Sequence, residues 1–235
     1  MAESLGIIWR YVQGMSLTFT GQRPVTNLPL PEFSSSIWSF AQLTWPSLDV
    51  FAAALKTKGY KESAGKHEFA RPLKILLTER LESDATSYVA AQPGVVRLIT
   101  VIYPLSGTPT DRFRAQWAVH AESFGHLCPH YQRNICLGLT RERIDEVLEQ
   151  TQFSPAEPVL QGGYEEMVFS DAQMAKEFLD KHSKQMQLSY ENFCSAESFC
   201  VGLDSVVQYS EGDRGIKQVI LGRVVSVALG LGLVP

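Results

Sequence analysis

The feature that most constrains the fold of this chain is an internal similarity between residues 43–81 and a passage that starts near residue 166. Each passage opens with a short apolar stretch that ends in an aromatic residue, Trp45 or Phe169. In each, a serine precedes an amphipathic stretch, and serine is well suited to cap the free N–H groups of a new helix. Each then closes with a segment typical of a β-strand. A repeat with a spacing of 124 residues, from Trp45 to Phe169, indicates duplicated domains rather than a solenoid.

The second half of the chain shows the full order of elements. Residues 94–105 read GVVRLITVIYPL, and this stretch is apolar on both faces, as in a strand that is covered on both sides. From this strand to residue 210, the order is strand, helix, strand, strand, helix, strand, which is the ferredoxin-like plan. Such a sheet carries helices on one face only, so its other face needs a cover. A second copy of the sheet would supply it, and we therefore predict an α+β fold made of two modules that close on each other within one chain.

The first module is expected to be a degenerate copy. The proline-rich stretch GQRPVTNLPLPEFSSS, residues 21–36, reads as a loop and occupies the place of the first helix. We place the degenerate module at residues 1–85, the second module at residues 93–210 and a C-terminal tail at residues 211–235. Twelve uncharged residues follow Arg223 in this tail, too few to span a bilayer, so we expect it to pack on the core or to be disordered, with a peripheral membrane contact as the alternative.

Composition narrows the class of function. The net charge of −4 and the lack of a strongly basic cluster argue against a nucleic-acid partner. Four cysteines without a Cys-x-x-Cys pair indicate reduced thiols and a cytoplasmic location. The sequence contains neither a Gly-rich phosphate loop nor a Gly-x-Ser-x-Gly elbow, which argues against nucleotide-dependent enzymes and serine hydrolases.

Three of the five histidines gather in residues 117–133, WAVHAESFGHLCPHYQR. One histidine of this segment belongs to a stripe at helical spacing: Phe113, Trp117, His120, Phe124 and Leu127. His120 is therefore a polar ring on an aromatic, inward-facing stripe, where it must either form hydrogen bonds or serve a function.

Three hypotheses compete for this segment. His120 is a core histidine satisfied by a hydrogen-bonding partner, or it lines a pocket and moves protons, for which an ordinary pKa of about 6.5 suits it. Neighbouring aromatic side chains would then hold a flat apolar substrate. In the third hypothesis, His126, Cys128 and His130 bind a metal, although their spacing fits no standard zinc pattern. We also expect Tyr190 and His182 at the surface.

The stretch DRFRAQWAVHAESFGHLCPHYQRN resembles the signature of the EthD domain family. The matching positions are Phe113, Trp117 and His120 on the helix, followed by Tyr131 and Asn134 near the second strand. The resemblance covers residues 93–210 and implies a dimeric α+β barrel, formed here within one chain. It also implies the cofactor-free chemistry of relatives in fungal biosynthetic clusters, which act on polyketides by decarboxylation, cyclisation, dehydration or oxidation.

We therefore predict a cofactor-independent enzyme of secondary metabolism that acts as a decarboxylase, cyclase or dehydratase on a small hydrophobic, polyketide-like substrate. His120 would be the general acid or base, and Tyr131 or Tyr103 would polarise a carbonyl. The expected substrate-binding residues are Phe113, Trp117, Phe124, His130 and Asn134. The alternatives are a non-catalytic protein that binds a hydrophobic metabolite and a cofactor-free monooxygenase. We expect no metal and no membrane span, and either a monomer with pseudo-twofold symmetry or a homodimer.

Overall fold

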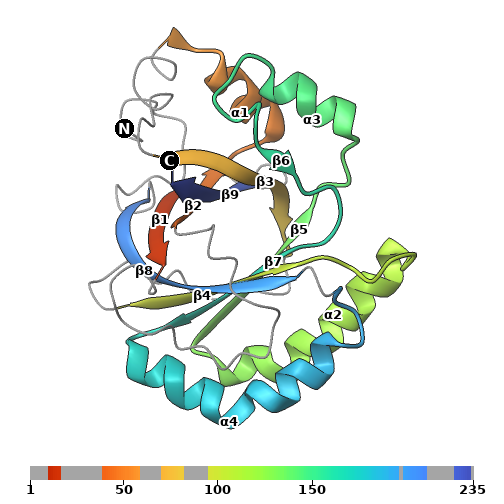
Figure 1. The fold of residues 1–235 in the computed structure, drawn as a ribbon, viewed down its shortest axis with the longest axis vertical. Helices are drawn as coiled ribbons and strands as arrows, with labels where there is room; N and C mark the ends of the chain where they lie inside the picture. Colours follow the sequence, from red (N-terminus) through yellow and green to blue (C-terminus); the bar gives the residue numbers. More distant parts are fainter. Residues whose placement is uncertain are drawn as a thin grey trace.

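The computed structural model describes residues 10–16, 39–58, 70–81, 95–195, 198–210 and 225–233. This part of the chain forms an α+β fold with one sheet and two pairs of helices (Figure 1). The strands are β1 (Arg10–Ser16), β2 (Ser39–Trp45), β3 (Ala70–Arg80), β4 (Val96–Ile102), β5 (His130–Cys136), β6 (Glu157–Pro158), β7 (Gly163–Phe169), β8 (Phe199–Ser210) and β9 (Val225–Leu233). The helices are α1 (Leu48–Leu55), α2 (Thr110–Phe124), the short 3₁₀ helix η4 (Gly125–Leu127), α3 (Arg141–Leu148) and α4 (Ala172–Tyr190).

The sheet closes on itself. Its strand order is β5-β7-β4-β8-β1-β2-β9-β3-β6, and β3 pairs in addition with β5. The closing pair is antiparallel, with Glu79 opposite Ile135 and Thr78 opposite Cys136. Every other pairing is antiparallel too, except that of β3 with the short strand β6.

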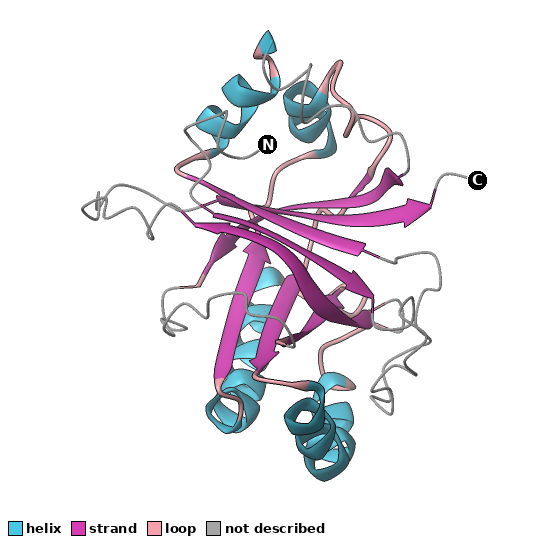
Figure 2. Ribbon diagram, turned by 90° about the vertical axis from the view of Figure 1, so that its left-hand side faces the viewer, coloured by secondary structure: helices cyan, strands magenta, loops and turns pink. Residues whose placement is uncertain are grey.

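The helices lie in two pairs on opposite sides of the closed sheet, α1 with α3 and α2 with α4 (Figures 1 and 2). Three apolar clusters follow from this arrangement. One cluster joins α2 and α4 to the sheet, and a second joins α1 and α3 to it. The third contains Leu76, Ile99, Val101 and Tyr164 but no helical residue, so it fills the interior of the closed sheet.

Residues 95–210 follow the predicted order of elements, with an insertion. Strand β4, helix α2, strands β5 and β7, helix α4 and strand β8 occur in that order, and the strands lie in the spatial order β5-β7-β4-β8. Helices α2 and α4 cover the same face of these strands. The insertion, residues 137–162, contains α3 and β6, which the sequence did not lead us to expect.

The first half of the fold is completed by segments from elsewhere in the chain. Helix α3 packs beside α1 through Ile144, Val147 and Leu148. The C-terminal segment, which we expected as a tail, forms β9 between β2 and β3. The predicted proline-rich loop at residues 21–36 lies outside the described residues.

Local capping differs between the two similar passages. Ser47 caps α1 as expected, with its side chain accepting a hydrogen bond from the Val50 N–H at 3.2 Å. At α4 the cap is Asp171 and not the preceding serine, because the Asp171 carboxylate accepts from the Met174 N–H at 2.8 Å. A carboxylate at this position also interacts favourably with the helix dipole.

Candidate functional site

A fully buried carboxylate, Glu165 of β7, lies between the sheet and the helix pair α2/α4. It accepts hydrogen bonds from three aromatic side chains. The indole N–H of Trp117 is 3.0 Å from Oε2, and the hydroxyl of Tyr131 is 2.6 Å from the same oxygen. The hydroxyl of Tyr190 donates to the other oxygen, Oε1. These donors come from α2, β5 and α4, so one carboxylate joins two helices to the sheet.

His120 lies beside this carboxylate and is also fully buried. Its Nε2 is 3.7 Å from Glu165 Oε1, which is within ion-pair range but longer than a hydrogen bond. Its Nδ1 is 2.9 Å from the hydroxyl oxygen of Ser189 on α4. The imidazole also packs against the ring of Tyr190, with 4.2 Å between centroids, and against Phe124 at 4.9 Å.

The carboxylate selects one tautomer of the neutral imidazole. A proton on Nε2 points positive charge at Glu165, whereas a lone pair on Nε2 would face a negative oxygen. We therefore assign the proton of neutral His120 to Nε2. Nδ1 is then the acceptor, and the Ser189 hydroxyl donates to it. The basic nitrogen of His120 thus points toward Ser189, which is only half-buried, rather than toward the core.

Glu165 remains ionised in spite of its burial. Burial by itself raises the pKa of this carboxyl, but the charge of the protonated His120 ring and the hydrogen bonds from Tyr131 and Tyr190 outweigh it and hold the pKa below the ordinary value. A second cationic side chain is close, because Arg133 lies opposite Glu165 in the β5–β7 register and is buried. Its guanidinium lies 6.0 Å from the centroid of the Trp117 ring.

The structure brings five of the eight predicted site residues together. Phe113, Trp117, His120, Phe124 and Tyr131 all belong to the apolar cluster beneath α2 and α4 or lie directly against it. The ring of Phe113 is 5.4 Å from that of Trp117 and continues the aromatic wall away from His120.

The other three predicted residues lie on the opposite face of the sheet. Tyr103 packs with the cluster inside the closed sheet, and its ring lies 5.4 Å from Lys74 Nζ. Asn134 and His130 alternate with Tyr131 along β5 and so point to that interior as well. Asn134 is fully buried, and its Oδ1 accepts a hydrogen bond from Gln132. A sheet therefore separates Tyr103, His130 and Asn134 from His120.

Three residues of this centre were missed by sequence reasoning. Tyr190, expected at the surface, is 2% exposed, and that prediction was wrong. Glu165 carried a usable signal, because two glutamates stand side by side in the apolar strand GYEEMVF and a buried carboxylate must be paired. Ser189 carried none, since a serine within a polar stretch of helix is unremarkable.

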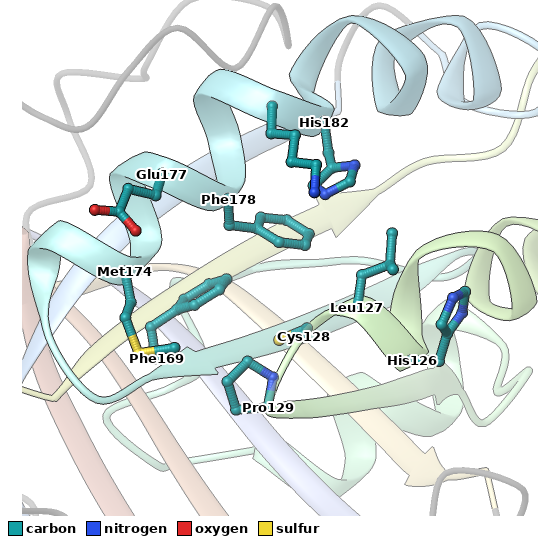
Figure 3. A pocket seen from close by; sticks show the side chains of 10 residues that line it. His126, Leu127, Cys128, Pro129, Phe169, Met174, Glu177, Phe178 and His182 are labelled. Atoms are coloured by element: carbon teal, nitrogen blue, oxygen red, sulfur yellow. The ribbon is translucent and has the colours of Figure 1, made fainter.

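A groove opens between α4 and the turn that follows α2 (Figure 3), and none of the residues of the centre line it. Its volume is about 420 Å³, and the rings of Phe169 and Phe178 pack against each other in its lining, with 5.2 Å between centroids. The remaining lining residues are His126, Leu127, Cys128, Pro129, Met174, Glu177, Lys181 and His182. Phe169, Met167 and Glu165 occupy the same face of β7, so the groove lies about 13 Å from the carboxylate at 3.3 Å per residue.

The metal hypothesis finds no support in the described part of the chain, where no group of three or more histidine, cysteine or acidic side chains is placed to bind an ion. The Nδ1 of His126 bonds to the backbone oxygen of Glu122. The Cys128 thiol donates to the backbone oxygen of His130, and burial raises its pKa to about 11. Within the same residues, no helix has both the length and the apolar composition needed to cross a membrane.

No family model matches the chain, and no curated protein matches it. The chemistry of the centre therefore follows from its own side chains. An ionised carboxylate beside a histidine can stabilise positive charge on the ring, and the phenols of Tyr131 and Tyr190 hold that carboxylate in place by hydrogen bonds. This set of groups is suited to accepting, holding and returning a proton.

Proposed function

We propose that this protein is a cofactor-independent enzyme that moves protons on a small hydrophobic, polyketide-like substrate, with His120 as the general acid and base. The observation that carries the proposal is the buried pair of His120 and ionised Glu165. When Nδ1 accepts a proton, the positive charge on the ring forms 3.7 Å from the carboxylate. In a site shielded from water, that charge pair is stabilised more strongly than it would be in solvent.

The step is a proton transfer next to a carbonyl group. A C–H bond of the substrate breaks, an N–H bond forms at Nδ1 of His120, and the electron pair moves to the carbonyl oxygen. His120 then returns the proton, either to carbon, as in a cyclisation or after loss of carbon dioxide, or to a leaving hydroxyl, as in a dehydration. Of the two tyrosines expected to polarise the carbonyl, only Tyr131 lies on the side of His120, because Tyr103 lies across the sheet. Its single O–H, which donates to Glu165, would turn to the carbonyl oxygen of the substrate. Such a shuttle supplies roughly 10²–10⁴-fold acceleration.

The groove between α4 and the turn after α2 is the proposed site for the apolar part of the substrate. Phe124, Met167 and Met186 belong to the same core cluster and lie between the groove and Glu165 along α2, β7 and α4. Methionine side chains are unbranched and change rotamer easily, so they form a wall that a ligand can displace.

The topology supports the family resemblance as part of this proposal. The strand order β5-β7-β4-β8, antiparallel and covered by α2 and α4 on one face, is that of a ferredoxin-like module. In this proposal the first module is the degenerate one, and β9 and α3 take the places of the strand and helix that it lacks. The two modules would join at β8–β1 and β3–β5, as expected for an intrachain version of the dimeric α+β barrel of EthD domains. Because closure needs one chain only, we propose a monomer with pseudo-twofold symmetry, with a homodimer as the alternative. The free thiols of Cys128, Cys136 and Cys194 support a cytoplasmic location as part of the same proposal.

Metabolite profiles of the source organism test the proposal and require no assumption about the identity of the substrate. The gene is deleted and then restored as wild type, as His120→Ala or as Val119→Ala, the control on the neighbouring, 63% exposed position. We expect an intermediate to accumulate in the deletion and in the His120→Ala strain only. The mass difference between this intermediate and the normal product identifies the reaction. A difference of one carbon dioxide indicates decarboxylation, one water indicates dehydration, one oxygen atom indicates the monooxygenase alternative, and no difference indicates cyclisation.

The second candidate function is non-catalytic binding of a hydrophobic metabolite. It is favoured by the position of the groove, which is separated from His120 by the wall of Phe124, Met167 and Met186. Binding there needs no chemistry. If the His120→Ala gene restores the wild-type profile and the protein is folded, the enzyme proposal fails and the binding function stands.

A further inference from the structure

We infer that Ser189 is a nucleophile activated by His120 and Glu165, and that the centre transfers acyl groups from hydrophobic esters or thioesters. This inference rests on the base assigned to His120 in the proposed function and adds a covalent step to it. Three side chains carry it: an alcohol, an imidazole that accepts its hydrogen bond, and a carboxylate on the far side of the ring.

The order of the three groups and the short distance between the serine and the imidazole are those that activate a serine. The Ser189 Oγ is 2.9 Å from Nδ1 of His120, which is within hydrogen-bond range. On the opposite side of the ring, Nε2 faces Oε1 of Glu165 at 3.7 Å. A carboxylate in this position fixes the tautomer that accepts the hydroxyl proton and stabilises the imidazolium that results. The same arrangement recurs on unrelated folds and is recognised by geometry rather than by sequence order.

The three residues differ in how deeply they are buried, and this difference indicates which of them a substrate can reach. His120 and Glu165 are fully buried, whereas Ser189 is half-buried on the last turn of α4. The hydroxyl is therefore the member of the set that a substrate reaches first.

The rings around His120 indicate the substrate class. Tyr190, Phe124 and Phe193 lie 4.2, 4.9 and 5.6 Å from the imidazole, centroid to centroid. An apolar acyl chain would pack against these rings. Gln116, one turn before His120, donates from Nε2 to the backbone oxygen of Asn192 at 3.1 Å, and the second N–H of this nitrogen can donate to an oxyanion.

The reaction balances with water as the second substrate. The Ser189 proton passes to Nδ1 while Oγ attacks the carbonyl carbon, and the C–O or C–S bond of the ester breaks as the imidazolium protonates the leaving alcohol or thiol. Water then attacks the acyl-serine, gives its proton to Nδ1, and the Ser189 oxygen leaves and takes that proton back. The Gly-x-Ser-x-Gly elbow is absent from the sequence, but that motif belongs to one way of presenting a serine, and here a helix end presents it.

A fluorophosphonate probe tests the inference on the full-length protein. The Ser189 oxygen would displace fluoride from phosphorus, which leaves one adduct per chain, visible in the intact mass and mapped by peptide analysis. We expect Ser189→Ala to abolish labelling and His120→Asn to slow it by roughly 10²–10⁴-fold, the usual contribution of a general base. Ser123→Ala is the matched control, because this exposed serine of α2 bonds to the backbone oxygen of Val119 and should leave labelling unchanged.

The outcomes separate this inference from the proposed function. No adduct on folded wild-type protein, or an adduct at another residue, overturns the nucleophile. If His120→Asn does not fold, Ser189→Ala and Ser189→Thr serve instead, because position 189 is only half-buried and threonine keeps a hydroxyl. Ser189→Ala could also lose the label while the gene that encodes this variant still restores the metabolite profile. In that case Ser189 is a nucleophile that the native reaction does not use, and the inferred acyl transfer fails. Loss of both label and product supports it.

Discussion

The hydroxyl of Tyr190, the last residue of α4, donates a hydrogen bond to Glu165 in the middle of β7. This contact fixes the end of a 19-residue helix to the sheet. Because Ser189 is the adjacent residue, the same contact places its hydroxyl against His120. One hydrogen bond thus sets both the packing of α4 and the geometry of the candidate centre.

Replacing Tyr190 with phenylalanine removes this bond while keeping the ring that packs on His120. Hydrogen bonds to a charged group contribute about 1.5–3 kcal/mol, so we expect Tyr190→Phe to lower the free energy of unfolding by about that amount. Urea denaturation measures the change. Leu188→Ala, on the exposed side of the same turn, is the control and should stay within about 0.5 kcal/mol of wild type. A variant as stable as wild type would show that the bond does not hold the helix end.

The stability of the fold should depend on pH through Glu165. Its pKa in the folded protein lies below the ordinary value of about 4.5, because the charge and hydrogen bonds of its partners outweigh burial. The folded state therefore binds this proton less readily than the unfolded state does. Its stabilising contribution is fully present above about pH 4.5 and is lost as the pH falls through the lower, folded-state pKa.

Urea unfolding between pH 7 and pH 3 checks this dependence. We expect wild type to lose more stability over that interval than Glu165→Gln, which has no proton to bind at this position. At pH 7 the free energy of unfolding of Glu165→Gln should be lower than that of wild type. In wild type the donors share two carboxylate oxygens, whereas the amide of glutamine offers only one acceptor oxygen. Glu177→Gln, at an exposed position of α4, should follow the wild-type curve. Equal slopes for wild type and Glu165→Gln would contradict the lowered pKa.

The sequence predicted helix α2 and the buried strand β4 because both rest on local periodicity. The aromatic stripe at steps of three and four placed Phe113, Trp117 and His120 on one helical face, and the structure buries all three. The α+β class followed from the order of these elements. The packing of α3 beside α1 and the pairing of β9 with β2 and β3 had no such signal. Both depend on contacts between segments that are far apart in the sequence, and no local pattern encodes such contacts.

The division of the candidate site across the sheet also escaped prediction for a physical reason. Alternation along a strand shows which residues share a face but not which face a helix covers, and β4 is buried on both faces. Tyr103 could therefore not be placed on the side of His120 or away from it. The pairing of Glu165 with Tyr131 and Tyr190 requires the register of β5 with β7 and the length of α4, which the sequence alone leaves open.

Three thiols should react slowly in the folded protein. Burial raises the pKa of Cys128 to about 11 and that of Cys136 to about 12, and it raises the pKa of Cys194 as well. Because the thiolate is the reactive form, a rise of two units from 9 lowers its fraction about 100-fold at pH 8, before access is considered. Peptide mapping after brief iodoacetamide treatment, with and without urea, should show these three cysteines modified in urea only. Rapid modification under native conditions would mean that these parts of the core open.

Gly125 lies against the ring of Tyr131, and this contact links the end of α2 to the candidate centre. A Cβ at residue 125 would come within 2.8 Å of Tyr131 Cδ1, which real contacts do not tolerate. The backbone of Gly125 is helical, at φ −60° and ψ −37°, so alanine fits there apart from this clash. We expect Gly125→Ala to destabilise the protein by about 1–3 kcal/mol, the usual effect of overpacking. The displaced ring would also lose its 2.6 Å hydrogen bond to Glu165.

A double-mutant cycle identifies the cause. In a Tyr131→Phe background the ring remains, so Gly125→Ala should still destabilise by a similar amount. In a Tyr131→Ala background the clash is gone, and Gly125→Ala should be neutral or stabilising by up to about 1 kcal/mol, because alanine is the better helix former. Urea denaturation of the six proteins gives the coupling. If Gly125→Ala costs the same in all three backgrounds, the Tyr131 ring does not require the glycine, and the end of α2 does not set the position of that phenol at Glu165.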